Sequence, residues 1–367
     1  MVGSGQISAT GESGQILNTS SPANHGGTQY PAALRALARD LSEASKAFND
    51  ADNRRAAWQL LSTALLFFPL VALMFVLAET HYALALLLAI PAGGLLTRFF
   101  ALQHDCGHGS FFTARAANEM AGRFISVLTF TPYDYWRRSH AQHHAGSGNL
   151  DRRGIGDVDT LTVREFASLG FWGRLRYRAM RHPLVALLIG PPVYFLFLQR
   201  VMFNTRLGIA ASLKSIAAHN AALIVFYGAL IYAFGLVPVL QVVLPVVLMG
   251  AWIGGALFYV QHQFEETLWD SADVWDVKVA ALKGSSHLIL PRALNWLTCD
   301  IAIHHVHHLS SRIPNYRLRE CLDALPALQT ISPHLTLGQA IASARLALWD
   351  ETTRKLISFR QFKTQYA

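Results

Sequence analysis

Two long apolar stretches of the chain each fold back at a short break. Residues 56–78 carry no charge, and after a break of three polar residues a second apolar run continues to Arg98. No Asp, Glu, Lys or Arg lies between Lys214 and Glu265, and this stretch is broken near Gly235. About 20 apolar residues are enough for a helix to cross a bilayer. The pattern therefore predicts two helical hairpins, which together provide four membrane spans.

A third apolar segment, residues 183–203, is interrupted by two consecutive prolines, Pro191 and Pro192. Arginines precede it and follow it closely. Because Lys and Arg concentrate on the cytoplasmic side of membrane proteins, both of its ends are expected there. This favours a re-entrant or interfacial segment over a fifth span. The whole pattern predicts an all-α polytopic membrane protein with two transmembrane hairpins, one such segment and a helical cap.

Basic residues also orient the two hairpins. Arg54 and Arg55 precede the first span and Arg98 ends the second, whereas neither hairpin turn carries Lys or Arg. The turns are therefore expected outside the cell, and residues 99–182 and 263–367 in the cytoplasm. The helical cap would be built from these two segments.

The composition agrees with a membrane protein and argues against nucleic acid as a partner. Of the 367 residues, 52% are hydrophobic and 15% are charged, against about a quarter in average soluble domains. The net charge of +8 is attributed to basic residues that orient the spans in the membrane. A nucleic-acid-binding surface would show a stripe of basic and aromatic residues, and the sequence has none. The chain divides into a disordered tail rich in Gly and Ser (1–30), a membrane domain (31–330) and a C-terminal helical tail (331–367).

Histidines gather in four places that this topology brings to one side of the membrane. Eight of them have the i, i+3 and i+4 spacings that share one helix face, within three short motifs, HDCGH, HAQHH and HHVHH, the last of which also contains His305. A ninth, in YVQHQF, follows the last span by about one turn. The nine candidate metal ligands are His104, His108, His140, His143, His144, His262, His304, His307 and His308.

The number of imidazoles constrains the kind of metal site. Neutral imidazole suits zinc, copper, iron and nickel, and a structural zinc takes about four ligands, often including cysteine. Nine imidazoles are too many for one ion and suffice for two. The residues alone therefore predict two imidazole-rich sites beside the membrane, without the identity of the metal.

The three motifs, spread among two helical hairpins, resemble the histidine boxes of the membrane fatty acid desaturase family. The resemblance extends from about residue 56 to Tyr316, and HDCGHGSFF, YVQHQFEETLW and HHVHHLSSRIPNY are similar to bacterial desaturases of the Δ12, or omega-6, type. It implies two iron ions (Fe2+/Fe3+) bound by the nine histidines, O2 as co-substrate, and desaturation of a fatty acyl chain with reduction of O2 to water.

The same resemblance implies the partners and the location. The acyl substrate would be carried on lipid, coenzyme A or acyl carrier protein, and the enzyme would lie in a bacterial inner membrane with its site facing the cytoplasm. The chain has no CxxC pair and no nicotinamide-binding fingerprint. An external electron donor is therefore expected, such as ferredoxin, or cytochrome b5 with its reductase. No catalytic side chain beyond the metal ligands is predicted.

Three residues near the boxes need a separate account. Phe258 stands one turn before His262, where animal acyl-coenzyme A desaturases have an asparagine that holds a metal-bound water. Asp300 stands one turn before His304, where close relatives commonly have asparagine; it is expected either to orient that imidazole or to be a charge at the start of a helix. His305 lies off the face of the third box and is expected behind the ligands or in solvent.

The sequence is also compatible with other functions. Related hydroxylases and ketolases, acting on acyl chains, alkanes or carotenoids, share the histidine boxes. A membrane metal transporter or metal-storage protein would place polar ligands along the spans, where only His219 occurs here. The arginine-rich stretch 173–182 is expected either to dock an acidic electron donor or to hold the membrane surface. The GxxxG pair Gly250 and Gly254 predicts close helix packing.

Overall fold

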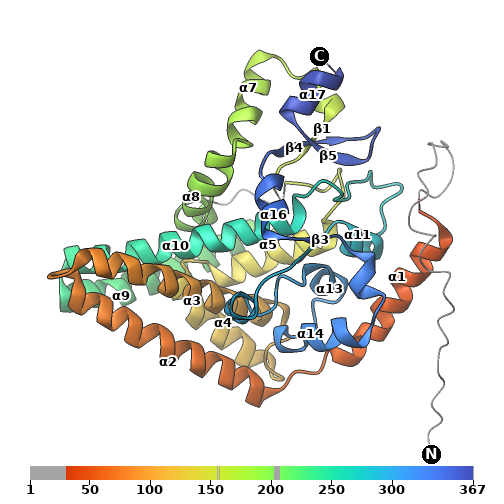
Figure 1. Cartoon of the computed structure of the whole chain (residues 1–367). Coiled ribbons are helices and arrows are strands. Elements are labelled where there is room, and N and C mark those ends of the chain that lie inside the picture. Colours follow the sequence, from red (N-terminus) through yellow and green to blue (C-terminus); the bar gives the residue numbers. More distant parts are fainter. Residues whose placement is uncertain (1–29, 155, 157, 202–206, 367) are drawn as a thin grey trace, which may run out of the picture.

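Four long helices form the spanning part of the molecule, in two antiparallel pairs (Figure 1). The computed structural model describes residues 30–154, 156, 158–201 and 207–366, so the predicted disordered tail, except for its last residue, lies outside the described part. All four helices are long and apolar enough to cross a membrane, which confirms the polytopic all-α prediction. They are α2 (Asn53–Ala78), α3 (Tyr82–His108), α9 (Ile209–Phe234) and α10 (Leu236–His262).

Helices α3 and α10 continue beyond the predicted ends of their spans. Arg98 lies within α3, and its buried guanidinium is hydrogen-bonded inside the protein: Nε donates to Thr63 Oγ1 at 3.0 Å, and Nη1 donates to Trp296 O. α3 ends only at Gly109, which adopts the left-handed conformation (φ 70°) that terminates helices. The first histidine pair therefore lies on the same helix as the second span, and the histidine predicted after the last span is the final residue of α10.

Glycines bring α3 and α10 close together. A Cβ atom on Gly93 would lie 3.0 Å from the backbone nitrogen of Gly250, and a Cβ on Gly250 would lie 3.4 Å from Gly93 O. Gly250 therefore takes part in the helix packing that its GxxxG spacing predicts. Gly254 does not, because among the described residues no atom beyond its own stretch of helix lies within 4 Å of the position that its Cβ would occupy. This close crossing fixes how the two histidine-bearing spans face each other.

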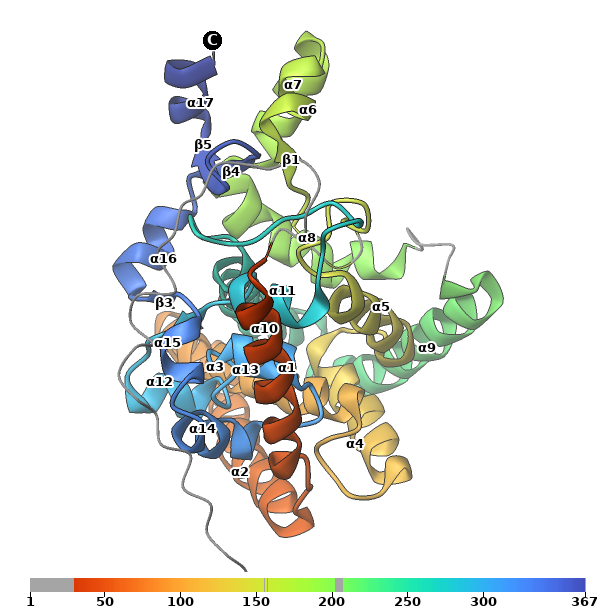
Figure 2. The same ribbon diagram turned by 90° about the vertical axis from the view of Figure 1, so that its right-hand side faces the viewer.

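Shorter helices form a cap over the histidine end of the spans. They are α1 (Ala32–Ser45, followed by a 3-10 turn Lys46–Phe48), α4 (Arg115–Thr129), α5 (Tyr133–Gly146), α11 (Val277–Lys283), α12 (Arg292–Leu297), α13 (His304–Leu309), α14 (Asn315–Ala324) and α15 (Leu328–Ile331). Figure 2 looks onto this cap and shows α1 lying across it. An apolar core that includes Leu41, Leu282 and Val306 joins α1, α11 and α13. The cap thereby holds α13, which carries the third histidine box.

The segment predicted as re-entrant or interfacial is a bent series of short helices. α6 (Val163–Ser168) and α7 (Phe171–Met180) precede it, and it consists of a π-helix (Leu184–Ile189), α8 (Gly190–Leu196) and a 3-10 turn (Leu198–Arg200). The axis bends by 53° after α7, as in a broken span or a re-entrant loop.

The proline pair accounts for the irregular backbone and for its contact with α10. Pro192 has no N–H to donate to the carbonyl of Leu188 one turn earlier. Trp252 of α10 supplies the missing donor, since its Nε1 donates to Leu188 O at 2.8 Å. The carbonyl left free by Pro192 therefore binds this segment to α10 through Trp252.

The C-terminal segment 331–367, predicted as a helical tail, is helical only in part. α16 (Leu337–Ser343) and α17 (Phe359–Tyr366) flank an antiparallel hairpin of β4 (Leu346–Asp350) and β5 (Lys355–Ser358). β4 also pairs in parallel with β1 (Leu161–Thr162), and β2 (His287–Leu288) pairs in parallel with β3 (His334–Leu335). The helical prediction was wrong for β4 and β5, because local periodicity does not show that β1 supplies hydrogen bonds from far away in the sequence.

Candidate metal centre

All nine predicted ligands converge in two adjacent groups at the cap end of the spans. Within each group, one ring nitrogen per histidine lies within 4.8 Å of the others. Four helices supply them, namely α3, α5, α10 and α13. Cluster A consists of His104, His108, His140, His144 and His307, and cluster B consists of His143, His262, His304 and His308.

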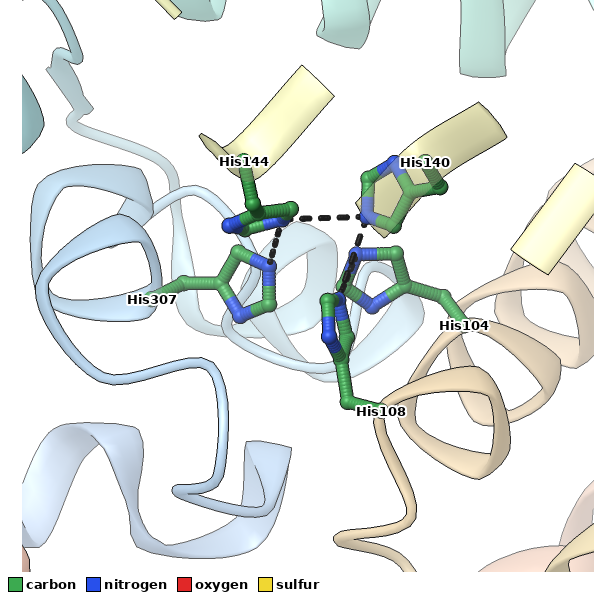
Figure 3. A group of neighbouring side chains, drawn as sticks. All are labelled: His104, His108, His140, His144 and His307. Carbon is green, nitrogen blue, oxygen red and sulfur yellow. Dashed lines mark hydrogen bonds between the residues drawn. The ribbon is translucent and has the colours of Figure 1, made fainter. Parts of the chain in front are cut away.

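The five rings of cluster A turn toward a common centre (Figure 3). Their Nε2 atoms follow one another closely. The distances are 3.3 Å from His104 to His108, 3.1 Å from His108 to His140, 3.1 Å from His140 to His144, and 3.1 Å from His144 to His307. A neutral imidazole carries one N–H and one lone pair. Several lone pairs around one point form the donor set that iron, zinc, copper or nickel prefers.

Cluster B is equally compact. His262 Nε2 and His304 Nε2 lie 3.0 Å apart, and the ring of His308 lies 4.8 Å from that of His262 and 4.5 Å from that of His304, measured between centroids. His308 Nε2 is buried and has no hydrogen-bond partner among the described residues. A buried nitrogen without a partner is costly unless something binds it. Cluster B therefore fits a metal ion on the evidence of its own side chains.

Helices α5 and α13 each contribute to both clusters. On α5, His143 belongs to cluster B and the other two ligands to cluster A; on α13, His307 belongs to cluster A and the other two to cluster B. The rings of His144 and His308 stack at the junction, with centroids 4.1 Å apart and planes inclined by 16°. The two clusters are therefore parts of one centre.

Backbone and side-chain acceptors orient two ligands on the spans. His262 Nδ1 donates to Gly284 O at 3.1 Å, which turns Nε2 toward cluster B. His104 Nδ1 faces Asp105 Oδ1 at 3.3 Å, and Asp105 Oδ2 accepts from Asn315 N at 2.6 Å and from Asn315 Nδ2 at 2.8 Å. Sequence reasoning missed Asp105 and Asn315, although an acidic residue directly after a ligand histidine was a usable signal.

Aromatic side chains line one side of the two histidine clusters. Trp136 stacks on His140 with centroids 4.8 Å apart, and Phe258 lies 5.5 Å from His143 and 5.7 Å from His262. The one-turn spacing thus places Phe258 beside cluster B, as the sequence predicts. Its ring has no group that could hold a water by hydrogen bonding. These rings keep that side of the histidines apolar.

Burial keeps the histidines of the cap neutral. Removal from water lowers the pKa of each ring well below its usual value of about 6.5, and the neighbouring imidazoles lower the pKa further. A neutral ring keeps one nitrogen lone pair free for a metal. The residues concerned are His140, His144, His304, His307 and His308.

Two residues predicted near the ligands have other contacts. Asp300 Oδ1 accepts from Arg319 Nη2 at 3.0 Å, and His304 Nδ1 has no partner among the described residues, so the expected contact between Asp300 and His304 is not formed. A left-handed turn at Asp300 (φ 53°) precedes α13 and breaks the helical spacing on which that expectation rested. His305 is fully buried rather than in solvent, and its Nε2 lies 2.9 Å from Leu328 O.

The chain is similar to proteins of one family over most of its length. The model of the family described as fatty acid desaturase matches residues 80–333, which include all nine histidines. The chain is 37% identical over 325 residues to a fatty acid desaturase of Bacillus subtilis (strain 168), covering 89% of this chain and 92% of that protein.

Two further relatives come from cyanobacteria. The chain is 28% identical over 284 residues to the sn-1 oleoyl-lipid 12-desaturase of Anabaena variabilis, covering 73% of this chain and 75% of that protein. It is 28% identical over 250 residues to the sn-1 acyl-lipid omega-3 desaturase (ferredoxin) of Synechocystis sp., covering 64% and 65%. Fold, histidine clusters and relatives agree, and the chain therefore belongs to the fatty acid desaturase family and is an enzyme of that kind.

Proposed function

We propose that clusters A and B each hold one iron ion and that the enzyme uses O2 to desaturate an acyl chain within the membrane. The observation that carries this proposal is the convergence of nine imidazoles at the end of two apolar spans. Two hydrogens leave adjacent methylenes, and together with two electrons and two protons from outside they reduce one O2 to two waters. The acyl chain gains one double bond.

The family and the reaction, rather than the donor set alone, support iron as the metal. Imidazole binds zinc, copper, nickel and iron alike, so the ligands alone do not select the metal. Desaturation needs a redox-active metal, which excludes zinc. When bound, the irons would supply the redox chemistry that no side chain provides.

The side chains of this protein contribute positioning and exclusion of water. Asp105 and Gly284 O accept the outer N–H groups of His104 and His262, so that the inner nitrogens face the clusters. Phe258 and Trp136 keep water from the apolar side of the rings. An unactivated methylene could then approach without a competing polar ligand.

We propose a double bond of the Δ12 or omega-6 type. The support is the amino-acid sequence of the histidine boxes and the names of relatives. Among these are the sn-1 oleoyl-lipid 12-desaturases of Anabaena variabilis and Synechocystis sp.. The Bacillus subtilis relative, at 37% identity, is named only as a fatty acid desaturase. The acyl chain on a membrane lipid is the proposed substrate, because the cyanobacterial names specify acyl lipids.

An external donor is proposed to deliver the electrons in the cytoplasm of a bacterial cell. One relative carries ferredoxin in its name, and cytochrome b5 with its reductase is the other candidate. The arginine-rich helix α7 supports membrane contact rather than donor docking, because Phe171 and Trp172 on it are 72% and 77% exposed. Exposed aromatic residues beside arginines are typical of helices that lie in a membrane interface.

The proposal is tested by the fatty acid profile of a bacterial host, measured by gas chromatography–mass spectrometry after derivatisation of double bonds. The host co-expresses a ferredoxin-type donor with its reductase. The unaltered chain is compared with His143→Ala, which lacks a cluster B ligand, and with His334→Ala as a control. His334 is exposed and lies outside both clusters.

New unsaturated chains are expected from the unaltered chain and from His334→Ala, and none from His143→Ala. The derivatised fragments also report the position of the double bond. Hydroxylated or keto products would instead assign the chain to oxygenating relatives. An unchanged profile from protein that contains iron and receives electrons would contradict the proposed reaction.

A further inference from the structure

An open hollow lies where span α2 begins, and none of the nine histidines lines it. Its volume of about 610 Å³ is within the range of about 300–1,000 Å³ that is usual for small-molecule sites. It lies between the start of α2 and helix α14. Six charged residues line it, namely Asp50, Asp52, Arg54, Arg55, Arg317 and Glu320. Three are positive and three are negative, so the hollow is polar without a net charge.

The hollow lies at the level of the lipid headgroups. α2 has 26 residues and is therefore about 39 Å long, whereas the hydrocarbon core of a bilayer is about 30 Å thick. The uncharged residues 56–78 cross this core, and residues 50–55 directly precede them. A hollow at this border is accessible to the phosphate groups of membrane lipids.

Ion pairs within the protein use four of the six charges. Arg55 Nη1 lies 2.5 Å from Glu320 Oε1, and Arg317 Nε lies 3.2 Å from Glu320 Oε2. Asp52 Oδ2 lies 3.9 Å from Arg55 Nε, and Asp52 Oδ1 caps the start of α2. These four side chains hold α14 against the start of α2, and their charges compensate one another.

The other two charges of the hollow are unpaired. Arg54 and Asp50 are exposed, and neither side chain forms an ion pair or a hydrogen bond with any described residue. An arginine presents a planar set of N–H donors that matches a phosphate group, and a carboxylate accepts hydrogen bonds from an ammonium group. The hollow is therefore complementary to a small zwitterion that carries one phosphate and one ammonium group.

The helix face that carries Arg54 continues into the bilayer as an apolar surface. Trp58, Leu61 and Leu65 follow Arg54 at intervals of four, three and four residues, which keeps them on one face of α2. Their exposed fractions are 65%, 52% and 59%, so the described part of the protein leaves this face largely open. A ligand whose polar group binds at Arg54 would have its apolar part beside this surface.

We propose that the hollow binds the headgroup of a membrane lipid of the phosphatidylethanolamine class. The phosphate accepts hydrogen bonds from Arg54, the ammonium group donates to Asp50, and the acyl chains extend along Trp58, Leu61 and Leu65. An anionic headgroup leaves Asp50 unpaired, and a choline headgroup has no N–H to donate to it. The site is therefore selective for the ethanolamine headgroup.

Lipid binding at this place also stabilises the cap. Tyr316 Oη, on α14, accepts from Asp52 N at 2.8 Å, and Asn315 at the start of α14 donates to Asp105 beside His104. The hollow exists only when α2 and α14 are docked against each other. A ligand that binds the native state alone raises the stability of that state. Bound lipid is therefore expected to raise the melting temperature of the protein.

The experiment titrates the full chain, purified with its metal in a non-ionic detergent and without an electron donor, with three lipids that share dioleoyl chains. They are phosphatidylethanolamine, phosphatidylcholine and phosphatidylglycerol. Native mass spectrometry counts the bound lipid, and the melting temperature is measured at the same concentrations. Arg54→Gln and Asp50→Asn remove the two unpaired charges. Arg115→Gln and Asp323→Asn are the matched controls, because both residues are exposed and lie outside the hollow.

The unaltered chain and both controls are expected to bind one phosphatidylethanolamine per chain, about fivefold more tightly than either other lipid. An exposed ion pair changes affinity by up to about fivefold, so Arg54→Gln and Asp50→Asn should each weaken this binding by about that factor. Both variants should also lose most of the rise in melting temperature. If Arg54→Gln cannot be purified, Asp50→Asn decides in the same way.

Equal or stronger binding of phosphatidylglycerol or phosphatidylcholine by the unaltered chain would overturn the inference, as would unchanged binding of phosphatidylethanolamine by the variants. Glycero-3-phosphoethanolamine, which has the headgroup but no acyl chains, is tested at the same concentrations. A rise in melting temperature as large as that from the lipid would assign the hollow to a soluble zwitterion and overturn the lipid as its occupant.

Discussion

Replacing Asp105 by asparagine tests how the first ligand of cluster A is oriented. Asp105 is only 1% exposed, and its carboxylate lies between His104 Nδ1 at 3.3 Å and two donors of Asn315 at 2.6 and 2.8 Å. Asparagine has nearly the same shape but offers one oxygen and one NH2 group. If the oxygen keeps the contacts with Asn315, the NH2 group faces His104.

The tautomer of His104 then changes. With aspartate, His104 Nδ1 donates its proton and Nε2 keeps the lone pair that faces cluster A. With asparagine, Nδ1 must accept, so the proton moves to Nε2 and the lone pair is lost from the cluster. Removing such an outer partner typically costs about 10-fold to 100-fold in metal affinity. The hydrogen bond is long at 3.3 Å, so we expect about tenfold, or about 1.4 kcal/mol.

Asp105→Asn is also expected to lower the free energy of unfolding, independently of its effect on iron affinity. Hydrogen bonds to charged groups contribute about 1.5–3 kcal/mol and neutral ones about 1 kcal/mol, so the two bonds from Asn315 would weaken by about 1–4 kcal/mol in total. The assay is iron retained by purified protein during titration with a chelator, together with the melting temperature. Asp134→Asn is the control, because Asp134 lies on α5 but pairs with Arg123 at 2.9 Å. Iron affinity of Asp105→Asn equal to that of the unaltered chain would refute the orientation argument.

Three further predictions concern the two clusters, the buried histidines His287 and His305, and the buried arginine of span α3. His143→Ala and His307→Ala each remove one ligand from a different cluster, and we expect both to abolish turnover in inserted protein; full activity of either variant would exclude a shared centre. Burial lowers the pKa of His287 to about 4 and of His305 to about 3, so both rings take up protons on unfolding below about pH 6.5. The melting temperature should therefore fall as pH drops from about 6.5 toward 4, and less so in His287→Gln; equal slopes would contradict this. Arg98→Met leaves the Trp296 carbonyl without its donor and should lower unfolding free energy by about 1–3 kcal/mol, measured by thermal denaturation in detergent; no change would be the contrary result.

The parts of the fold that follow from local spacing were predictable. Apolar runs of sufficient length located the four spans, and the i, i+3 and i+4 spacings selected the nine histidines that converge. The division of the nine into five and four was not predictable, because it depends on the angles at which α5 and α13 cross the spans. Neither was the contact of Asp105 with Asn315, which lies 210 residues further along the chain.

The C-terminal hairpin illustrates the same limit. Residues 346–350 carry a short apolar run that is compatible with a helix or a strand. β4 forms because Leu348 and Trp349 pair with Leu161 and Thr162 of β1, and because β5 supplies the other edge. A short buried run takes its conformation from such distant partners, and the sequence around it does not reveal them.

The sharing of α5 and α13 between both clusters determines how hybrid enzymes between relatives would behave. Of the four spans, α3 supplies ligands to cluster A only and α10 to cluster B only, whereas the cap helices α5 and α13 supply both clusters. A chimera that takes α3 or α10 from a relative therefore changes one cluster and leaves the ligands of the other intact. A chimera that takes α5 or α13 changes ligands of both clusters at once, and a tilt of either helix would displace both clusters. The spacing between the two clusters thus depends on single turns of α5 and α13.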